Sequence, residues 1–332
     1  MVGAVLVHQD RIIGEGWHKQ YGQPHAEVNC LESVQEADKH LIPESIMYVS
    51  LEPCAHHGKT PPCAVRLVQE QVKEVIISNT DPYEAVAGRG IDILQMHGID
   101  VTTGVSGDAG LWLNRRFFCF HQQKRPYIIL KWAQTPDRHF APADRSRCSI
   151  TNGESQALVH KWRTEEAAIM IGYNTALNDD PQLTSRIWAG KQPLRIVVDR
   201  NLQLPHTHNV YKPDARTWII NEQSERVEEH MRFVKLKFEG LLITEVLKQL
   251  HEASILSVII EGGAALLNSF IEQGYWDEAR VLTGQTRLPQ DSIIAPVLSN
   301  AVAAFETEIG TDNMEVYINN KSAYKYVPGM EL

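Results

Sequence analysis

Apolar and polar positions alternate along the chain in blocks that predict strands and helices in turn. In the first third, short apolar runs predict strands, and apolar residues at helical spacing predict the helices between them. The expected strands are residues 2–7, 12–13, 47–51 and 75–78, and the expected helices are residues 26–37, 64–72 and 90–97. This order favours a largely parallel sheet covered on both faces, with functional groups beyond the carboxyl ends of its strands.

A polar stretch at residues 121–126 interrupts this pattern, and a second α/β series follows it. A chain of 332 residues is too long for one ordinary core, so we expect two domains, residues 1–122 and residues 123–332. In the second domain, the expected strands are residues 127–132, 168–171, 194–198, 217–220 and 257–260, and the expected helices are residues 158–166 and 264–271.

The composition narrows the class of protein. An apolar content of 43% and a charged content of 22% are those of a globular chain, and no apolar run reaches the roughly 20 residues that span a bilayer. The formal net charge of −9 argues against a general nucleic-acid binder. Five scattered cysteines fit a reducing compartment better than a disulfide framework. We therefore expect a cytoplasmic protein without nucleic-acid or membrane partners.

The most informative chemistry lies in His25-Ala26-Glu27, followed by Pro53-Cys54 and Cys63. One imidazole and two thiolates can hold a zinc ion and leave its fourth position open for water, as catalytic zinc sites do. Glu27, outside the ligand set, could move protons on and off that water, which is the arrangement known from zinc deaminases. The alternative is that the cysteines are only small buried apolar residues.

The spacing of these residues also predicts where they lie. Positions i and i+2 do not share a helix face, so His25 and Glu27 can reach one metal only if His25 lies where a loop enters a helix. We expect Cys54, after Pro53, to lie at a second helix entrance, where the backbone N–H groups favour a thiolate.

Over essentially residues 1–320, the chain resembles the bifunctional deaminase/reductase family of riboflavin biosynthesis. The insert of eight residues between Cys54 and Cys63 is specific to that family, because nucleoside and tRNA deaminases typically have two. The matching motifs are residues 25–28 (HAEV), 51–63 (LEPCAHHGKTPPC), 81–82 (DP), 86–90 (VAGRG), 178–184 (NDDPQLT), 195–199 (RIVVD) and 261–263 (EGG).

The resemblance implies an α/β chain of two domains: an N-terminal three-layer α/β/α domain similar to cytidine deaminase and a C-terminal domain similar to dihydrofolate reductase. It implies zinc-dependent deamination of a phosphoribosylated diaminopyrimidinone, then NADPH-dependent reduction of its ribose portion to a ribityl chain. In the first reaction, Glu27 would be catalytic and His25, Cys54 and Cys63 would bind zinc. The implied substrate contacts are His18, His56, Lys59, Thr60 and Asp81. An ordinary solvated loop is the alternative for Lys59 and the histidines.

For the second reaction, the resemblance implies a dinucleotide site around the glycine turn before the helix at residues 264–271. The implied NADPH contacts are Ala133, Ser149, Thr175, Asp179, Arg200, Gly263, Ala264, Ala265, Leu266, Leu267, Asn268 and Ser269. The implied substrate contacts are Arg147, Arg163, Leu183, Arg186 and Glu261, with Arg163 and Arg186 suited to the substrate's phosphate. Surface ion pairing is the alternative for the arginines. Lys131, which opens the Lys-x-Ala motif, is a further candidate that could equally be an edge charge.

The sequence also departs from the family pattern. We expect the family's N-terminal helix and its Asn-Pro pair to be missing before the segment that begins at Met1. Tyr83 stands where an Asn is common, residues 135–138 (TPDR) replace Ser-Leu-Asp-Gly, and Ser149 replaces a common Trp. Family members commonly self-associate, so a homo-oligomer is expected.

Two other functions compete with this one. A tRNA or nucleoside deaminase is opposed by the long insert between the cysteines and by the acidic charge balance. A catalytically silent protein would keep zinc structurally and serve as an assembly module, since the loss of contact groups abolishes activity without abolishing the fold.

Overall fold

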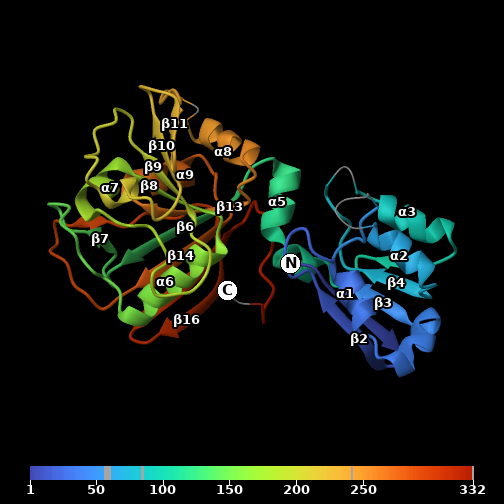
Figure 1. Cartoon of the computed structure of the whole chain (residues 1–332). Helices are drawn as coiled ribbons and strands as arrows, with labels where there is room; N and C mark the ends of the chain where they lie inside the picture. Colours follow the sequence, from blue (N-terminus) through green and yellow to red (C-terminus); the bar gives the residue numbers. More distant parts are fainter. Residues whose placement is uncertain (56–60, 84–85, 241, 331–332) are drawn as a thin grey trace. The chain divides into compact units, whose positions relative to one another are not determined.

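The computed structural model describes residues 1–55, 61–83, 86–240 and 242–330, which form two compact units (Figure 1). Unit 1 comprises Met1–Gln122 and Tyr324–Leu332, and unit 2 comprises Gln123–Ala323. The C-terminal segment is tied to unit 1, where the Trp112 indole N–H donates to the Met330 carbonyl at 2.9 Å. The sequence pattern alone assigns that segment to the second domain.

Unit 1 is built on a mixed sheet with the strand order β2-β1-β3-β4-β5. β1 (Gly3–His8) pairs antiparallel with both β2 (Arg11–Trp17) and β3 (Ile46–Val49). β4 (Glu74–Ile77) and β5 (Asp100–Thr103) continue from β3 in parallel. The expectation of a largely parallel sheet is therefore wrong for this unit.

A tight hairpin explains the antiparallel pairing. β1 and β2 are joined through Gln9 and Asp10, which have φ angles of 45° and 64°. Two consecutive left-handed residues are what a two-residue hairpin turn requires. The short polar connection thus leaves no room for the helix that a parallel crossover needs.

The three helices expected in unit 1 are present, but α1 and α2 end earlier than expected, α2 at Gln69 instead of residue 72. α1 ends at Ser33 instead of residue 37, because Val34 is extended and a separate 3₁₀ helix follows. The helices are α1 (Ala26–Ser33), the 3₁₀ helix η1 (Glu36–Glu44), α2 (Cys63–Gln69), α3 (Arg89–Met96), α4 (Gly107–Leu113) and α5 (Arg115–Gln123).

α1, α2 and α3 share one core with one face of the sheet. Alternate strand residues supply that face: Ala4, Leu6, Met47, Val49, Val75 and Ile77. α1 lies in close contact with β2 at Gly16, which has no side chain. A Cβ at this position would lie 2.4 Å from the Ala26 carbonyl oxygen and 2.2 Å from the Cys30 nitrogen. This close approach places the N-terminal part of α1 against β2, the strand at the edge of the sheet.

Within the described residues, unit 2 has ten strands in one sheet, in the order β11-β12-β10-β9-β8-β13-β6-β14-β17-β16. The strands from β12 to β14 in this order are parallel, and antiparallel pairs extend both ends. The strands are β6 (Tyr127–Gln134), β8 (Ala168–Gly172), β9 (Leu194–Val198), β10 (Thr217–Asn221), β11 (Arg226–Glu228), β12 (Met231–Lys235), β13 (Ser257–Gly262), β14 (Glu278–Thr283), β16 (Ala301–Ile309) and β17 (Asp312–Asn319). The five strands expected from the sequence are confirmed.

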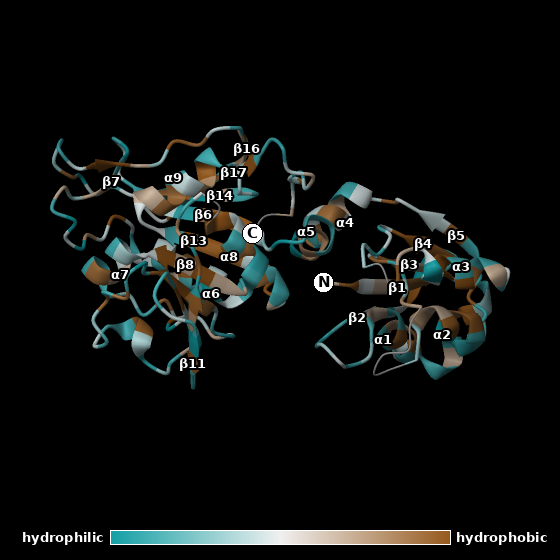
Figure 2. Cartoon of the chain, turned by 90° about the horizontal axis from the view of Figure 1, so that it is seen from above, coloured by the Kyte–Doolittle hydropathy of each residue, from teal (hydrophilic) through white to brown (hydrophobic). Residues whose placement is uncertain are grey.

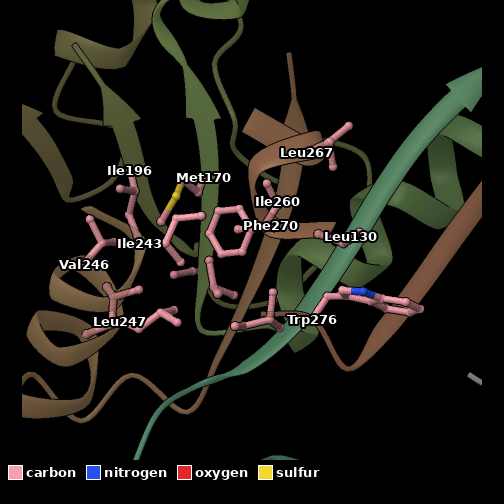
Figure 3. Close-up of a cluster of buried hydrophobic side chains, with 14 of the residues drawn as sticks. Leu130, Met170, Ile196, Ile243, Val246, Leu247, Ile260, Leu267, Phe270 and Trp276 are labelled. Atoms are coloured by element: carbon pink, nitrogen blue, oxygen red, sulfur yellow. The ribbon is translucent and has the colours of Figure 1, made fainter. Parts of the chain in front are cut away.

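Buried residues line both faces of the parallel strands in unit 2. On one face, Leu130, Met170, Ile196 and Ile260 pack against α8 (Leu242–Glu252) and α9 (Ala264–Glu272), as Figure 3 shows. On the other face, Ile169, Ile171, Val197 and Ile219 form a second cluster. Because both faces are buried, residues 168–171 of β8 and residues 258–260 of β13 are continuous apolar runs, which appear brown in Figure 2.

The rest of unit 2 includes elements that the apolar pattern did not predict. They are β11, β12, β14, β16 and β17, and a small pair formed by β7 (His139–Ala141) and β15 (Ile293–Ile294). The remaining helices are α6 (Gly153–Glu165), α7 (Tyr173–Asp179) and the 3₁₀ helix η2 (Asn209–Tyr211). α6 begins five residues before the expected residue 158, because the Asn152 side chain accepts from the Ser155 N–H at 2.8 Å and caps it. Across the described residues, every helix is too short or too polar to cross a bilayer.

A buried arginine holds the loops next to β9 and β10. Arg195 is fully buried, and its guanidinium donates to the Thr217 hydroxyl at 2.9 Å. Its remaining bonds reach the carbonyl oxygens of Gln182, Asn209, Lys212 and Ala215, at 3.4, 3.2, 2.6 and 2.7 Å. One side chain thus satisfies acceptors from several connecting segments.

We predict that Arg195→Met lowers the free energy of opening of β9 and β10 by roughly 3 kcal/mol, because several buried acceptors lose their donor. Native-state hydrogen exchange of the full chain measures this directly in the amides of the two strands. Arg216→Met, at an exposed position next to β10, is the matched control and should leave exchange unchanged. Equal exchange in the two variants would contradict the prediction.

Candidate functional site

Three side chains of unit 1 converge as the sequence predicts. His25 Nδ1 lies 3.5 Å from Cys54 Sγ and 3.3 Å from Cys63 Sγ. The three donor atoms all lie within 4.8 Å of one another. For a tetrahedral zinc ion with ordinary bond lengths, the nitrogen and each sulfur would be about 3.6 Å apart. The spacing of the donors therefore fits zinc.

The backbone around the three donors explains how they meet. His25 is the N-cap of α1 in an extended conformation, as expected for a residue where a loop enters a helix. Cys63, and not Cys54, is the first residue of a helix, so that expectation was wrong for Cys54. The Cys63 N–H donates to Cys54 Sγ at 3.3 Å, so the start of α2 still favours a thiolate at Cys54.

The two thiols of the site favour the binding of a cation. Hydrogen bonds from Cys63 and His25 lower the pKa of Cys54 to about 4, whereas the contact with Cys54 and burial raise the pKa of Cys63. A thiolate at Cys54 disfavours a second thiolate at Cys63, and a positive charge between the two sulfurs favours both. Soft sulfur and imidazole donors suit zinc, so the donor set and its geometry agree.

Glu27 lies beside this cluster without joining it. It is 3% exposed in the first turn of α1, and burial is the main cause that raises its pKa to about 7. A carboxyl group with that pKa can both accept and release a proton near neutral pH. The position and the pKa both suit proton transfer at the metal site.

A pocket of about 350 Å³ opens onto the cluster. His18 and Asp81, two of the expected substrate contacts, line it together with His25, Glu27 and Cys54. The His18 ring centroid lies 5.1 Å from that of His25. The other expected contacts, His56, Lys59 and Thr60, lie outside the described residues.

Glu52 is a residue of this pocket that sequence reasoning missed. Its side chain is buried, and its carboxylate accepts from the N–H groups of Asp81, Gly88 and Gly90 at 3.1, 3.0 and 2.9 Å. Glu52 therefore holds the segment that carries Asp81 while it precedes Pro53 and Cys54 in the chain. The sequence signal that could have identified Glu52 is its place as an acidic residue between a predicted strand and a predicted metal ligand.

In unit 2, the expected dinucleotide turn lies between β13 and α9. Gly263, the N-cap of α9, has a φ of 75° and makes no side-chain cap itself. A Cβ on Gly262 would lie 2.9 Å from Thr175 Cγ2, so this glycine lets Thr175 approach the turn. Free N–H groups at a glycine turn suit a phosphate.

The other expected NADPH contacts lie on several different elements of unit 2. Ala133 lies in β6, Asp179 ends α7, and the Ser149 hydroxyl accepts from the Gln156 side chain at 3.2 Å. Arg200 forms an ion pair with Glu222 at 2.7 Å. Along the first turns of α9 lie Ala264, Ala265, Leu266, Leu267, Asn268 and Ser269, of which Leu267 is buried in the core.

The expected substrate arginines of unit 2 lie near one another. Arg163 forms an ion pair with Glu261 at 2.7 Å. Burial lowers the pKa of Arg186, and the like charges of Arg163 and Arg147 lower it further. Leu183 is buried in the second core cluster with a φ of 57°.

Lys131 lies beside this cluster and is no edge charge. Burial lowers its pKa, while Glu261 acts in the opposite sense. Burial would raise the pKa of Glu261, but Arg163 and Lys131 lower it to about 2, so this carboxylate stays ionised. Cations gathered in this way suit an anionic ligand.

Comparison with known families agrees with both sites. Residues 1–79 match the cytidine and deoxycytidylate deaminase zinc-binding region, and residues 126–286 match the RibD C-terminal domain. Unit 1 thus carries the zinc-binding region, and unit 2 carries the reductase part of RibD.

Whole-chain relatives carry the same pair of domains. The riboflavin biosynthesis protein RibD of Aquifex aeolicus is 38% identical over 83% of this chain and 78% of its own length. RibD of Escherichia coli is 33% identical over 88% of this chain and 83% of its own. The solved RibD of Acinetobacter baumannii has a TM-score of 0.84 at 31% identity, over 96% of this chain and 91% of that one.

A Thermotoga maritima structure described as a diaminohydroxyphosphoribosylaminopyrimidine deaminase/5-amino-6-(5-phosphoribosylamino)uracil reductase is similarly close. It has a TM-score of 0.83 at 30% identity and covers 96% of this chain and 91% of that one. This chain therefore belongs to the RibD family of riboflavin biosynthesis and is a bifunctional enzyme, a zinc-dependent deaminase joined to an NADPH-dependent reductase.

Proposed function

We propose that residues 1–122 deaminate 2,5-diamino-6-(5-phosphoribosylamino)pyrimidin-4(3H)-one and that residues 123–332 reduce the product, 5-amino-6-(5-phosphoribosylamino)uracil. The observation that carries the proposal is the convergence of His25, Cys54 and Cys63 at a pocket that the buried Glu27 also lines. The Thermotoga maritima relative, whose description names both activities, supports it.

For deamination, His25, Cys54 and Cys63 would hold zinc, which supplies a Lewis acid that lowers the pKa of a water toward ~7. Glu27 takes a proton from the attacking water and delivers it to the departing amine, so that ammonia leaves and a carbonyl remains. Its pKa of about 7 suits both steps. His18 and Asp81 contact the substrate from the pocket wall.

For reduction, the glycine turn and the N-terminus of α9 hold the dinucleotide, and NADPH supplies the hydride when bound. The cluster of Arg147, Arg163 and Arg186 binds the substrate's phosphate, because guanidinium groups match phosphate oxygens in pairs. Glu261 and Lys131 lie beside that cluster and orient the sugar chain.

The assembly and the compartment belong to the same proposal. We propose a homo-oligomer that works in the cytoplasm on small molecules, without nucleic-acid or membrane partners. All five cysteines are free of disulfides, which suits a reducing compartment. The self-association rests on the family resemblance.

Glu27→Gln should keep zinc but lose ammonia release, with kcat lower by roughly a hundred- to ten-thousand-fold, because the amide cannot move the proton. Elemental analysis and an ammonia assay on the diaminopyrimidinone measure the two effects. Glu32→Gln, an exposed position on the same helix, is the control. Full turnover by Glu27→Gln would refute the role of Glu27.

Removal of the metal should separate the two activities. A chelator should abolish ammonia release, while NADPH oxidation on the deaminated product continues, because the proposed zinc ligands all lie in unit 1. Added zinc should restore deamination. A protein that keeps one equivalent of zinc but never releases ammonia would instead support the catalytically silent alternative.

Arg186→Met should raise the KM for the phosphorylated substrate of reduction by roughly ten- to a hundred-fold, because a charge-assisted contact to phosphate is lost. Steady-state NADPH oxidation measures this effect. Lys191→Met, an exposed cation of the same loop, is the control, and deamination should be unchanged in both variants. An unchanged KM in Arg186→Met would exclude this residue from the phosphate site.

A further inference from the structure

The pocket of unit 1 has an aromatic wall as well as a metal end. The same pocket of about 350 Å³ that His25, Cys54 and Glu27 line is also lined by Tyr21, Tyr83, Phe117 and His121. None of the expected catalytic or substrate residues belongs to this wall. The catalytic steps proposed above also make no use of it.

His121 is held by rings on several sides. On α5, its ring centroid lies 4.5 Å from that of Phe117 and 5.2 Å from that of Phe120, and both contacts are edge-to-face. The Tyr83 ring lies 5.3 Å from His121 at an interplanar angle of 54°. Such ring contacts restrain the side chains, so little freedom remains to be lost when a ligand binds.

The segment that carries Tyr83 is positioned through Glu52. The Asp81 N–H donates to the Glu52 carboxylate at 3.1 Å, and the Tyr83 N–H donates to the Asp81 carboxylate at 2.8 Å. Because Glu52 immediately precedes Pro53 and Cys54, one buried carboxylate positions both the metal ligand and the aromatic wall. The distance between wall and metal end is thus set by a short chain of hydrogen bonds.

The exposure of Tyr83 speaks against a role in packing alone. Tyr83 is 45% exposed, although its ring contacts that of His121 and the residue lines the pocket. A ring that only stabilised the fold would be expected in the core, where the apolar area removed from water is larger. The remaining aromatic surface is available to a ligand in the pocket.

The chemistry of the wall selects the part of the substrate that it contacts. Aromatic faces stack on flat conjugated rings, and a nucleobase-like ring binds in this way whatever its substituents. The planar pyrimidine ring is the matching part.

We infer that Tyr83 and His121 form the specificity-determining wall that stacks against the pyrimidine ring of the deaminase substrate and orients it toward the metal end. This inference rests on the proposed deamination and adds two binding residues to it. Phe117 supports the wall by holding the His121 ring.

The test compares Tyr83→Leu with Tyr83→Phe in the full-length, zinc-loaded enzyme. Tyr83→Leu should raise the KM of ammonia release by roughly 5- to 150-fold, the loss of one stacking contact, with a much smaller change in kcat. Tyr83→Phe keeps the ring and should restore most of the affinity. His121→Leu and His121→Phe should behave as a second pair of the same kind.

Two controls separate stacking from a folding defect. Tyr48→Leu removes an exposed tyrosine from β3, outside the pocket, and should leave the KM of deamination unchanged. Zinc content and NADPH oxidation on the deaminated product should equal wild type in every variant, because they report on the metal end and on unit 2.

The outcomes distinguish this inference from the proposed function. An active wild type whose KM is unaffected by Tyr83→Leu and His121→Leu overturns the inference alone. A zinc-loaded wild type that releases no ammonia overturns the proposed deamination and the inference with it. A Tyr83→Phe variant as impaired as Tyr83→Leu would show that the hydroxyl, and not the ring, makes the contact, and would also overturn the stacking model.

Discussion

Two sulfurs and a carboxyl group crowd one point in unit 1 beside the His25 imidazole, and the repulsion among their negatively charged forms is the constraint on which the site depends. Deprotonation of Cys54 is favoured, whereas deprotonation of Cys63 beside it is opposed. The buried Glu27 adds a further acid to the same region. A bound divalent cation relieves this conflict, because it favours the deprotonated form of every group around it. Metal binding and proton transfer are therefore two aspects of one electrostatic arrangement.

The fold of unit 1 brings these groups together through the ends of its elements. His25 caps α1, Cys63 begins α2, and Cys54 follows the segment after β3. Gly16 allows α1 to lie against β2, and without that approach the imidazole would move away from the sulfurs. Glu52 adds a second connection, because it anchors the Asp81 segment to the residues directly before Cys54. The rigidity of the site thus comes from backbone N–H groups as much as from packed side chains.

Unit 2 solves a different electrostatic problem. Arg163 and Arg147 each act on Arg186 as like charges, and the half-buried Lys131 adds a further cation near Arg163. Glu261 offsets part of this charge through its ion pair with Arg163, while the rest of the cluster keeps its attraction for an anion. The same logic explains why the glycine turn before α9 lies close by: both features suit phosphate groups, one through fixed cations and one through backbone N–H groups.

Sequence alone determined the chemistry of the metal site and the central strands of unit 2. The order of His25, Glu27, Cys54 and Cys63 indicates a zinc site whatever the surrounding fold, because ligand type and number define it. Strands such as β8 and β13 could be predicted because both of their faces are buried and their central residues form an apolar run.

Only the tertiary structure decided the features that depend on distant partners. β14 contains Glu278 and Arg280, which are buried because they pair with each other at 2.6 Å, so it does not look like a buried strand in sequence. The bonds of Glu52 and the contact of Tyr83 with His121 join segments about 30 to 40 residues apart. Hydrophobic periodicity reports on local burial, whereas these contacts arise where the folded chain brings polar and aromatic groups together. The stabilising energy of these contacts is therefore present only in the folded state.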